Sequence, residues 1–365
     1  ISVSFLINAD YLNTNITISL YFCINTILTM AEERFSDLGR VEAIARLYEG
    51  TPYKAFENIV FETSAKGYVT SHSRTFIEGM DFDLVYFPLK HLGYKCVTAV
   101  TGELYATFAQ PRVMEIRIGI SAKLDFAQIK EVWEGMMTAA QEHGYKKVGL
   151  DLVPSPNGLC ISVSSTGETT QLTSKRRPAA KTMDLICISD NVGAAFMGFQ
   201  VLEREKRAFE KSGDAKAQPK LDEYKNLVGA YLKPQINPQI LKLMEDAEII
   251  PSHGYLVTRG LADALKRLVR DSGLGAKIYV DKLPFAGKTF ELGKELNIDP
   301  MSAALNGGED YRLLFTIPIG KHDKFRHDFQ TFDIIGHLAK PEVGAALVTP
   351  DGLELPIKAQ GWKND

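Results

Sequence analysis

The sequence predicts an α/β or α+β fold with mixed sheets, because strand and helix patterns alternate along most of its 365 residues. The stretch Tyr255–Leu268 (YLVTRGLADALKRL) contains both patterns. An apolar strand end leads into Leu261, Leu265 and Leu268, whose spacings of four and three form one helical face. The length allows two domains of ordinary size, so a two-domain protein is expected.

A capping box predicts where a second helix begins. Asp125 is the expected N-cap, and Gln128, three residues on, completes the box. The apolar residues that follow recur on one face, and Gly144 ends the helix. Alternating and β-branched residues then predict strands at Lys147–Leu152 and Leu159–Ser165.

The second half of the chain continues the alternation. A strand at Leu185–Ser189 leads through a glycine turn into a long helix that ends near Lys211. Asn237 as N-cap and Pro238 in the first turn predict the start of another helix. Further elements are expected at Ala276–Val280 (strand), Phe290–Leu296 (helix), Tyr311–Pro318 (strand) and Phe332–His337 (strand).

Composition changes mark the expected domain boundaries. Residues 1–29 contain no Lys or Arg, and Asn and Thr interrupt their apolar runs, so no membrane span is expected there. We expect an extension outside the fold, such as a start-site artefact, with a poor signal peptide as the alternative. The polar, basic segment 169–182 predicts a linker between an amino-terminal domain, 30–168, and a carboxyl-terminal domain, 183–365.

Charge and cysteine usage exclude some classes of protein. A net charge of −3 gives no electrostatic argument for nucleic acid or an anionic membrane as partner. The four cysteines are scattered without a CxxC pair, which favours reduced thiols in a cytoplasmic protein. We find no Ser-His-Asp set, Walker-type glycine loop or metal-spaced His/Cys motif.

One segment resembles a known family signature. Asn306–Thr316 (NGGEDYRLLFT) resembles the GGEDYELLFT segment of thiamine-monophosphate kinases, which share a superfamily with aminoimidazole ribonucleotide synthetase. The resemblance runs from about Phe35 to Trp362 and includes Ile77–Phe82 (family EGVHF) and Asp184–Ala195. It implies a two-domain fold like that of the synthetase, with an amino-terminal sheet pairing across a dimer and a carboxyl-terminal α/β domain.

The resemblance also implies a reaction. Family members move the γ-phosphoryl group of ATP onto thiamine monophosphate, giving thiamine diphosphate. Both reactants are polyanions, so Mg²⁺ held by aspartates from several loops neutralises much of the charge. A homodimer with its active-site cleft between the domains is expected.

Several positions that match family metal acids have changed in this sequence. The first acid of GDDAAV corresponds to Phe56, and the acid before EGVHF corresponds to Arg74. The two acids of DxSDGL correspond to Leu256 and Arg259. Loss of several ligands together predicts weak or lost catalysis, since even one supporting residue is worth about 10–100-fold in metal affinity or activity.

Three carboxylates remain at matching positions. Glu57 follows the lost first acid, Glu103 replaces an aspartate, and Asp151 is kept from GGDTT. Glu103 and Asp151 are the candidate catalytic residues, and all three are candidate ligands of at most a weakly bound Mg²⁺. ATP and Mg²⁺ are therefore expected cofactors only by resemblance, with metal binding in doubt.

Basic residues suggest a different use of the site. Arg177 and Lys181 remain in the nucleotide-side loop, and Arg74 and Arg259 stand where metal acids converge. An arginine supplies about the same local charge as an aspartate with its Mg²⁺, and its planar donors can hold phosphate directly. The alternative is a solvated arginine whose acid was lost by neutral decay.

The substrate side gives four further candidates. Glu309 and Asp310 lie in the signature loop, where polar turn chemistry is the alternative explanation. Trp362 matches a family aromatic that covers the thiamine rings, or it is a packing residue. Asp81 stands where the family often has His near the substrate phosphate, and a carboxylate there disfavours thiamine monophosphate as the ligand.

Three functions remain open from the sequence. The chain is a kinase with an altered metal site, a non-catalytic protein that binds a phosphorylated ligand, or a heterodimer partner of an intact kinase. The pattern of losses favours weak or lost catalysis.

Overall fold

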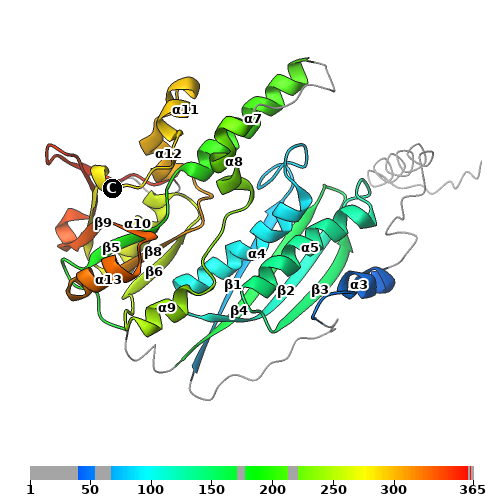
Figure 1. Cartoon of the computed structure of the whole chain (residues 1–365), viewed down its shortest axis with the longest axis horizontal. Helices are drawn as coiled ribbons and strands as arrows, with labels where there is room; N and C mark the ends of the chain where they lie inside the picture. Colours follow the sequence, from blue (N-terminus) through cyan, green and yellow to red (C-terminus); the bar gives the residue numbers. More distant parts are fainter. Residues whose placement is uncertain (1–39, 54–66, 171–176, 213–220, 361, 363–365) are drawn as a thin grey trace, which may run out of the picture.

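The computed structural model describes residues 40–53, 67–170, 177–212, 221–360 and 362. Two sheets, one in each half of the chain, organise these residues (Figure 1). The expected mixed α/β architecture is confirmed. The extension expected at 1–29 and residues 171–176 of the expected linker lie outside the described residues.

The first sheet has four strands in the order β1-β4-β2-β3. β4 pairs antiparallel with both β1 and β2, and β3 pairs parallel with β2. α4 and α5 lie side by side over one face of this sheet (Figure 1). The elements are α3 (Arg40–Tyr48), β1 (Gly67–Ile77), α4 (Leu89–Ala106), β2 (Gln110–Ile120), α5 (Phe126–Glu142), β3 (Lys147–Pro154) and β4 (Cys160–Thr170).

Two glycines let α4 and α5 touch backbone to backbone. A Cβ on Gly93 would meet the carbonyl oxygen of Val132 at 1.9 Å, and one on Gly135 would meet that of Lys90 at 1.9 Å. Because no side chain fits at either position, both helices present glycine at the contact. α5 begins as predicted, with both hydrogen bonds of the Asp125–Gln128 capping box present.

The second sheet has seven strands in the order β11-β10-β7-β9-β5-β8-β6. α7 and α11 project away from it at the top of Figure 1, and α9 lies below. The strands are β5 (Leu185–Ser189), β6 (His253–Val257), β7 (Gly275–Tyr279), β8 (Arg312–Ile317), β9 (Phe332–Ala339), β10 (Ala345–Val348) and β11 (Glu354–Pro356). The α-helices are α7 (Ala194–Ser212), α8 (Lys225–Leu232), α9 (Ile240–Asp246), α10 (Leu261–Ser272), α11 (Thr289–Leu296), α12 (Pro300–Asn306) and α13 (His322–Asp328).

Two element boundaries correct the sequence predictions. α9 begins at Ile240 rather than at Asn237, whose side chain accepts from the backbone N–H of Gln239 at 2.9 Å and forms a turn before the helix. β4 continues through Thr170, so the first two residues of the predicted linker are strand. The strand of the opening stretch and the helix after it are confirmed as β6 and α10.

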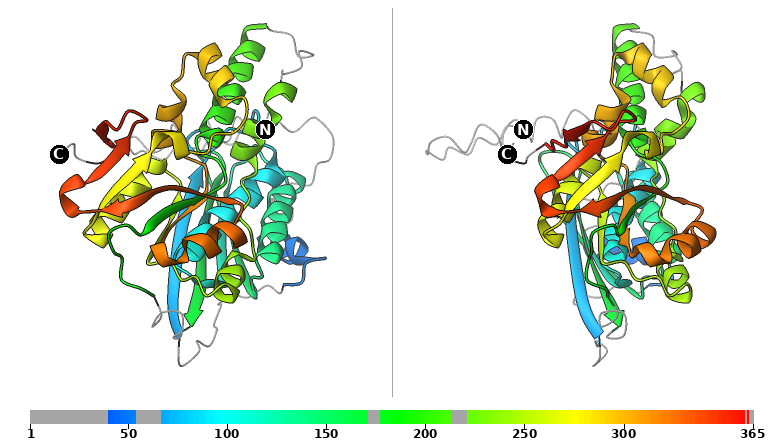
Figure 2. Two further views of the ribbon diagram at one scale, coloured as in Figure 1. Left: turned by 60° about the vertical axis from the view of Figure 1, so that its left-hand side comes forward. Right: turned by 90° about the vertical axis from the view of Figure 1, so that its left-hand side faces the viewer.

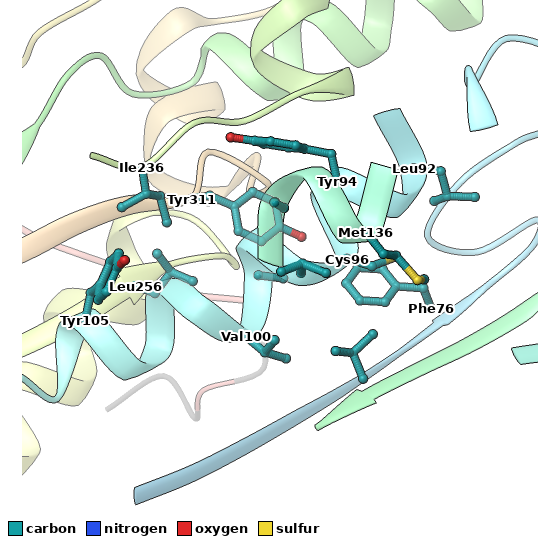
Figure 3. Packing of buried hydrophobic residues seen from close by; sticks show 14 of the residues in the cluster. Phe76, Leu92, Tyr94, Cys96, Val100, Tyr105, Met136, Ile236, Leu256 and Tyr311 are labelled. Carbon is teal, nitrogen blue, oxygen red and sulfur yellow. The ribbon is translucent and has the colours of Figure 1, made fainter. Parts of the chain in front are cut away.

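One apolar cluster joins the two halves. Figure 3 shows side chains of α4, such as Val100, beside Leu256 and Tyr311 from the second half. Gly102 makes this approach possible, because a Cβ there would meet Leu256 Cδ1 at 2.6 Å and Ile236 Cδ1 at 2.7 Å. Leu256, at a position matching a family acid, is therefore a core residue that packs into the space left by a helical glycine.

The side view in Figure 2 shows the two sheets with their helices and the strand β1 running along the lower part of the molecule. None of the helices in the described ranges is long and apolar enough to cross a membrane.

Candidate functional site

A cavity of about 630 Å³ lies between β1, α4 and the segments that follow β6 and precede β8. Both halves of the chain contribute to its walls. Its charged lining residues are Arg74, Asp81, Glu103, Arg259, Asp263, Arg267 and Glu309. The structure thus gathers five of the predicted site residues in one place: Arg74, Asp81, Glu103, Arg259 and Glu309.

The turn that presents Arg259 depends on the glycine after it. Gly260 has φ 92°, a conformation that favours glycine, and a Cβ there would meet the carbonyl oxygen of Leu305 at 2.3 Å. This turn therefore presses against the end of α12 and directs the chain from β6 into α10. Arg259 is exposed at the cavity wall, and among the described residues it has no hydrogen bond or ion pair.

Glu309 is the centre of a partly buried charge cluster. Its Oε1 lies 2.8 Å from Nη2 of Arg74, and its Oε2 lies 2.8 Å from Nζ of Lys95. The hydroxyl of Tyr311 donates to Oε2 at 3.1 Å. Lys95 is only 1% exposed, and its ammonium lies 3.8 Å from the centre of the Tyr231 ring. Glu309 therefore links β1 and α4 of the first half to the loop before β8.

The cluster changes the pKa values of its members. Burial alone would raise the pKa of Glu309, but Lys95 and Arg74 outweigh burial and lower it to about 2. Burial lowers the pKa of Lys95, and Glu309 opposes that effect. The charge of Lys95 therefore favours ionisation of Glu309, and the charge of Glu309 favours ionisation of Lys95.

Arg74 is already paired inside the protein. Its Nη2 also lies 3.6 Å from Oδ1 of Asp81, and its guanidinium lies 4.8 Å from the centre of the Phe76 ring. Asp81 accepts a hydrogen bond from the backbone N–H of Ile77 through Oδ2 at 2.9 Å. Of the predicted phosphate-binding arginines, Arg259 is free in the cavity, whereas Arg74 is engaged by two carboxylates.

A second ion pair lies on α10, where both of its residues line the cavity. Nε of Arg267 lies 3.1 Å from Oδ2 of Asp263, one turn apart on α10. Trp362 donates its indole N–H to Oδ1 of Asp263 at 2.8 Å, and Arg270 lies over the indole ring at 5.6 Å. Trp362 thus holds Asp263 by a hydrogen bond and does not itself line the cavity. Its contact with substrate stays a prediction.

Glu103 is the cavity carboxylate without an ion pair among the residues described. Burial raises the pKa of Glu103, and Arg267, Arg74 and Arg259 oppose the rise through their charges. A half-buried carboxyl among three arginines can accept or donate a hydrogen bond to a ligand.

Asp151 lies apart from this cavity. It stands on β3, where its Oδ2 is 3.9 Å from Nε of Arg117, whose side chain is 69% exposed. Leu150 and Leu152 face the helices, so Asp151 lies on the other face of the sheet. The sheet order also separates β3 from β1 by three strand spacings, roughly 14 Å. Within one chain, the structure does not bring Asp151 and Glu103 together, and their shared metal site stays a prediction.

The remaining predicted residues that the structure describes also lie outside the cavity lining. Asp310 is 1% exposed and accepts from the backbone N–H groups of Gly193 (2.8 Å) and Ala195 (3.2 Å), so it caps the start of α7. Arg177 donates to the carbonyl oxygen of Pro251 at 3.3 Å, and Lys181 is exposed. Glu57 lies outside the described residues. Their binding roles stay predictions.

The cavity carboxylates fit Mg²⁺ poorly as they stand. Asp81, Asp263 and Glu309 are each paired with a cationic side chain. In the part of the chain that the structure describes, no group of three His, Cys, Asp or Glu side chains is arranged to hold a metal ion. We therefore assign no step of a reaction to a metal bound by these residues.

Comparisons with known proteins support the family expectation. The model of the AIR synthase related protein, N-terminal domain, matches residues 57–169. The thiamine-monophosphate kinase of Aquifex aeolicus (strain VF5) is 23% identical over 287 residues, which are 79% of this chain and 85% of that protein. Over most of its length the chain is thus similar to thiamine-monophosphate kinases.

Two solved structures share the fold of this chain. AaThiL complexed with AMPPCP and TMP aligns with a TM-score of 0.64 at 20% identity and covers 90% of this chain and 97% of that chain. E. coli HypE, a hydrogenase maturation protein, aligns with a TM-score of 0.65 at 13% identity and covers 88% and 97% of the two chains.

Sequence reasoning missed Lys95, Asp263 and Arg267. Asp263 and Arg267 stand four residues apart on a predicted helix, which is the spacing of a helical ion pair and could have identified them. Lys95 gave no such signal, because its partner Glu309 lies more than 200 residues away in the sequence.

Proposed function

We propose that this protein binds a phosphate-bearing ligand, a nucleotide or thiamine monophosphate, in the cavity and has weak or no phosphoryl-transfer activity. One observation supports this most: the cavity is lined by three arginines, and its paired carboxylates are neutralised by side chains of the protein itself. A related structure, AaThiL, was solved with AMPPCP and TMP, which supports ligands of this chemistry.

Phosphate binding follows from the donors that remain. Arg259 is exposed and unpaired within the described chain, and Arg74 and Arg267 keep further N–H groups beyond their ion pairs. A guanidinium binds phosphate oxygens in a planar, bidentate manner. It does not bridge the reacting oxygens as a coordinated metal does, so efficient in-line transfer is not expected.

A coupled assay that follows ATP-dependent formation of thiamine diphosphate tests the catalytic part. We expect turnover far below that of a family member with its metal acids intact, measured with saturating Mg²⁺ at the same protein concentration. Comparable turnover of the two proteins would overturn the proposal.

Calorimetric titration with ATP, ADP and thiamine monophosphate tests the binding part, with EDTA present or absent. Arg259→Ala is expected to weaken binding by at least about tenfold, because one charge-assisted hydrogen bond is worth roughly 1.5–3 kcal/mol. Arg326→Ala, an exposed arginine on α13 that does not line the cavity, is the matched control and should leave the affinity unchanged. Binding that requires Mg²⁺, or that is insensitive to Arg259→Ala, contradicts the model.

We also propose a homodimer formed through the first sheet. Thr75, Glu115 and Arg117 on the face away from α4 and α5 are exposed, which leaves this face open to a partner. Light scattering after size exclusion tests it, and a monomer at micromolar concentration would count against the idea.

A further inference from the structure

Two carboxylates from different halves of the chain meet at one nitrogen atom. Nη2 of Arg74 lies 2.8 Å from Oε1 of Glu309 and 3.6 Å from Oδ1 of Asp81. The other oxygen of each carboxylate is already engaged: Oδ2 of Asp81 by the N–H of Ile77 at 2.9 Å, and Oε2 of Glu309 by Lys95 at 2.8 Å. The remaining oxygens, Oδ1 of Asp81 and Oε1 of Glu309, therefore face the same position, which the guanidinium of Arg74 occupies.

Two carboxylate oxygens at one position can bind a divalent ion as well as a guanidinium. Mg²⁺ in proteins is commonly held by one or two carboxylates, with water and substrate phosphates completing the octahedron. Arg74 prevents this in two ways. Its guanidinium fills the space between the two oxygens, and its permanent positive charge repels a second cation.

The arginine is also held in this position by its surroundings. Its guanidinium lies 4.8 Å from the ring centre of Phe76 and 5.6 Å from that of Tyr311. Its side chain is 27% exposed, so part of the guanidinium still faces the cavity. A tethered cation of this kind cannot diffuse away, and it needs no ion from solution.

We propose that Arg74 is a built-in counterion that excludes divalent cations from the cavity, and that neutralising it creates a divalent-cation site from Asp81 and Glu309. The inference rests on the proposed use of this cavity and deepens it: the ligand taken up is a metal-free phosphate ester rather than its Mg²⁺ complex. A titration with the cation alone contains no such ligand, so its result is independent of the ligand-binding test.

Titration of the full chain with Mn²⁺, followed by the loss of the free-ion electron paramagnetic resonance signal, tests the proposal. Arg74→Met is expected to bind one Mn²⁺ at least about tenfold more tightly than the unmodified protein, since it removes a charge in contact with both ligands. Arg74→Lys keeps the charge and should resemble the unmodified protein. Adding Asp81→Asn to Arg74→Met should abolish the gain.

Arg259→Met is the matched control, because it removes the same charge from the same cavity without touching either carboxylate. A gain equal to that of Arg74→Met would attribute the effect to overall charge and overturn the proposal. Failure of a folded Arg74→Met protein to bind Mn²⁺ would also overturn it, with folding checked by circular dichroism and Arg74→Gln as a second variant. The proposal would also be overturned if the unmodified protein bound Mn²⁺ tightly and Asp81→Asn abolished that binding.

Discussion

Replacing Lys95 with methionine isolates the charge that ties the two halves of the chain together. Lys95 is 1% exposed, and its ammonium lies 2.8 Å from Oε2 of Glu309. Methionine keeps an apolar stem beside the Tyr231 ring but removes the charge. Removing one partner of a buried pair typically costs ~3–5 kcal/mol. Since Arg74 stays 2.8 Å from the other oxygen of Glu309, we expect the smaller loss of about 2–3 kcal/mol.

Urea unfolding followed by circular dichroism measures this loss as a lower midpoint with an unchanged slope. Lys288→Met is the control, because Lys288 also contacts two carboxylates, Glu223 at 3.1 Å and Glu291 at 2.9 Å, but at the surface. Surface ion pairs contribute little, so its midpoint should not move measurably. A midpoint for Lys95→Met equal to that of the control would refute the reasoning.

Two further changes test the core and the helix cap. Burial raises the pKa of Asp310 to about 6, so its carboxyl favours the folded state below pH 4 and loses that contribution, roughly 3 kcal/mol, as pH rises through 6. Asp310→Asn should flatten this part of the pH profile of thermal stability; an unchanged profile would refute the assignment. Gly102→Ala should destabilise by about 1–3 kcal/mol through overpacking against Leu256, and Leu256→Ala should recover part of it. Gly229→Ala, in open space on α8, is the control and should stabilise slightly; an equal loss at both glycines would contradict the packing argument.

The two helices that the sequence located most closely have a clear one-sided pattern. The helices α5 and α10 each have one apolar face and a polar one, and both were located correctly. α4 was not predicted as a helix, because most of its residues are buried all round and leave no periodic polar face. β1 (GYVTSHSRTFI) was missed since serine and threonine line its open face and weaken the strand signal.

The site was predictable in part, through matching positions in a family signature. Arg74, Glu103 and Arg259 were expected to converge, and they line one cavity. The same reasoning placed Asp151 with Glu103; within one chain the sheet lies between them, and their shared metal site stays a prediction. It also placed Asp310 on the substrate side; this carboxylate accepts from N–H groups at the start of α7, and its contact with a ligand stays a prediction.

The turn Thr258–Arg259–Gly260 shows how the two sources of information divide. The sequence by itself determined the strand, the turn and the helix, because spacing and turn chemistry act between residues a few positions apart. Only the tertiary structure decided that Arg259 is free while Arg74 is bound to Glu309, 235 residues away in the chain. The reason is physical: a charge takes its partner, its burial and its pKa from whatever the folded chain brings within a few ångströms, and sequence spacing does not contain that distance.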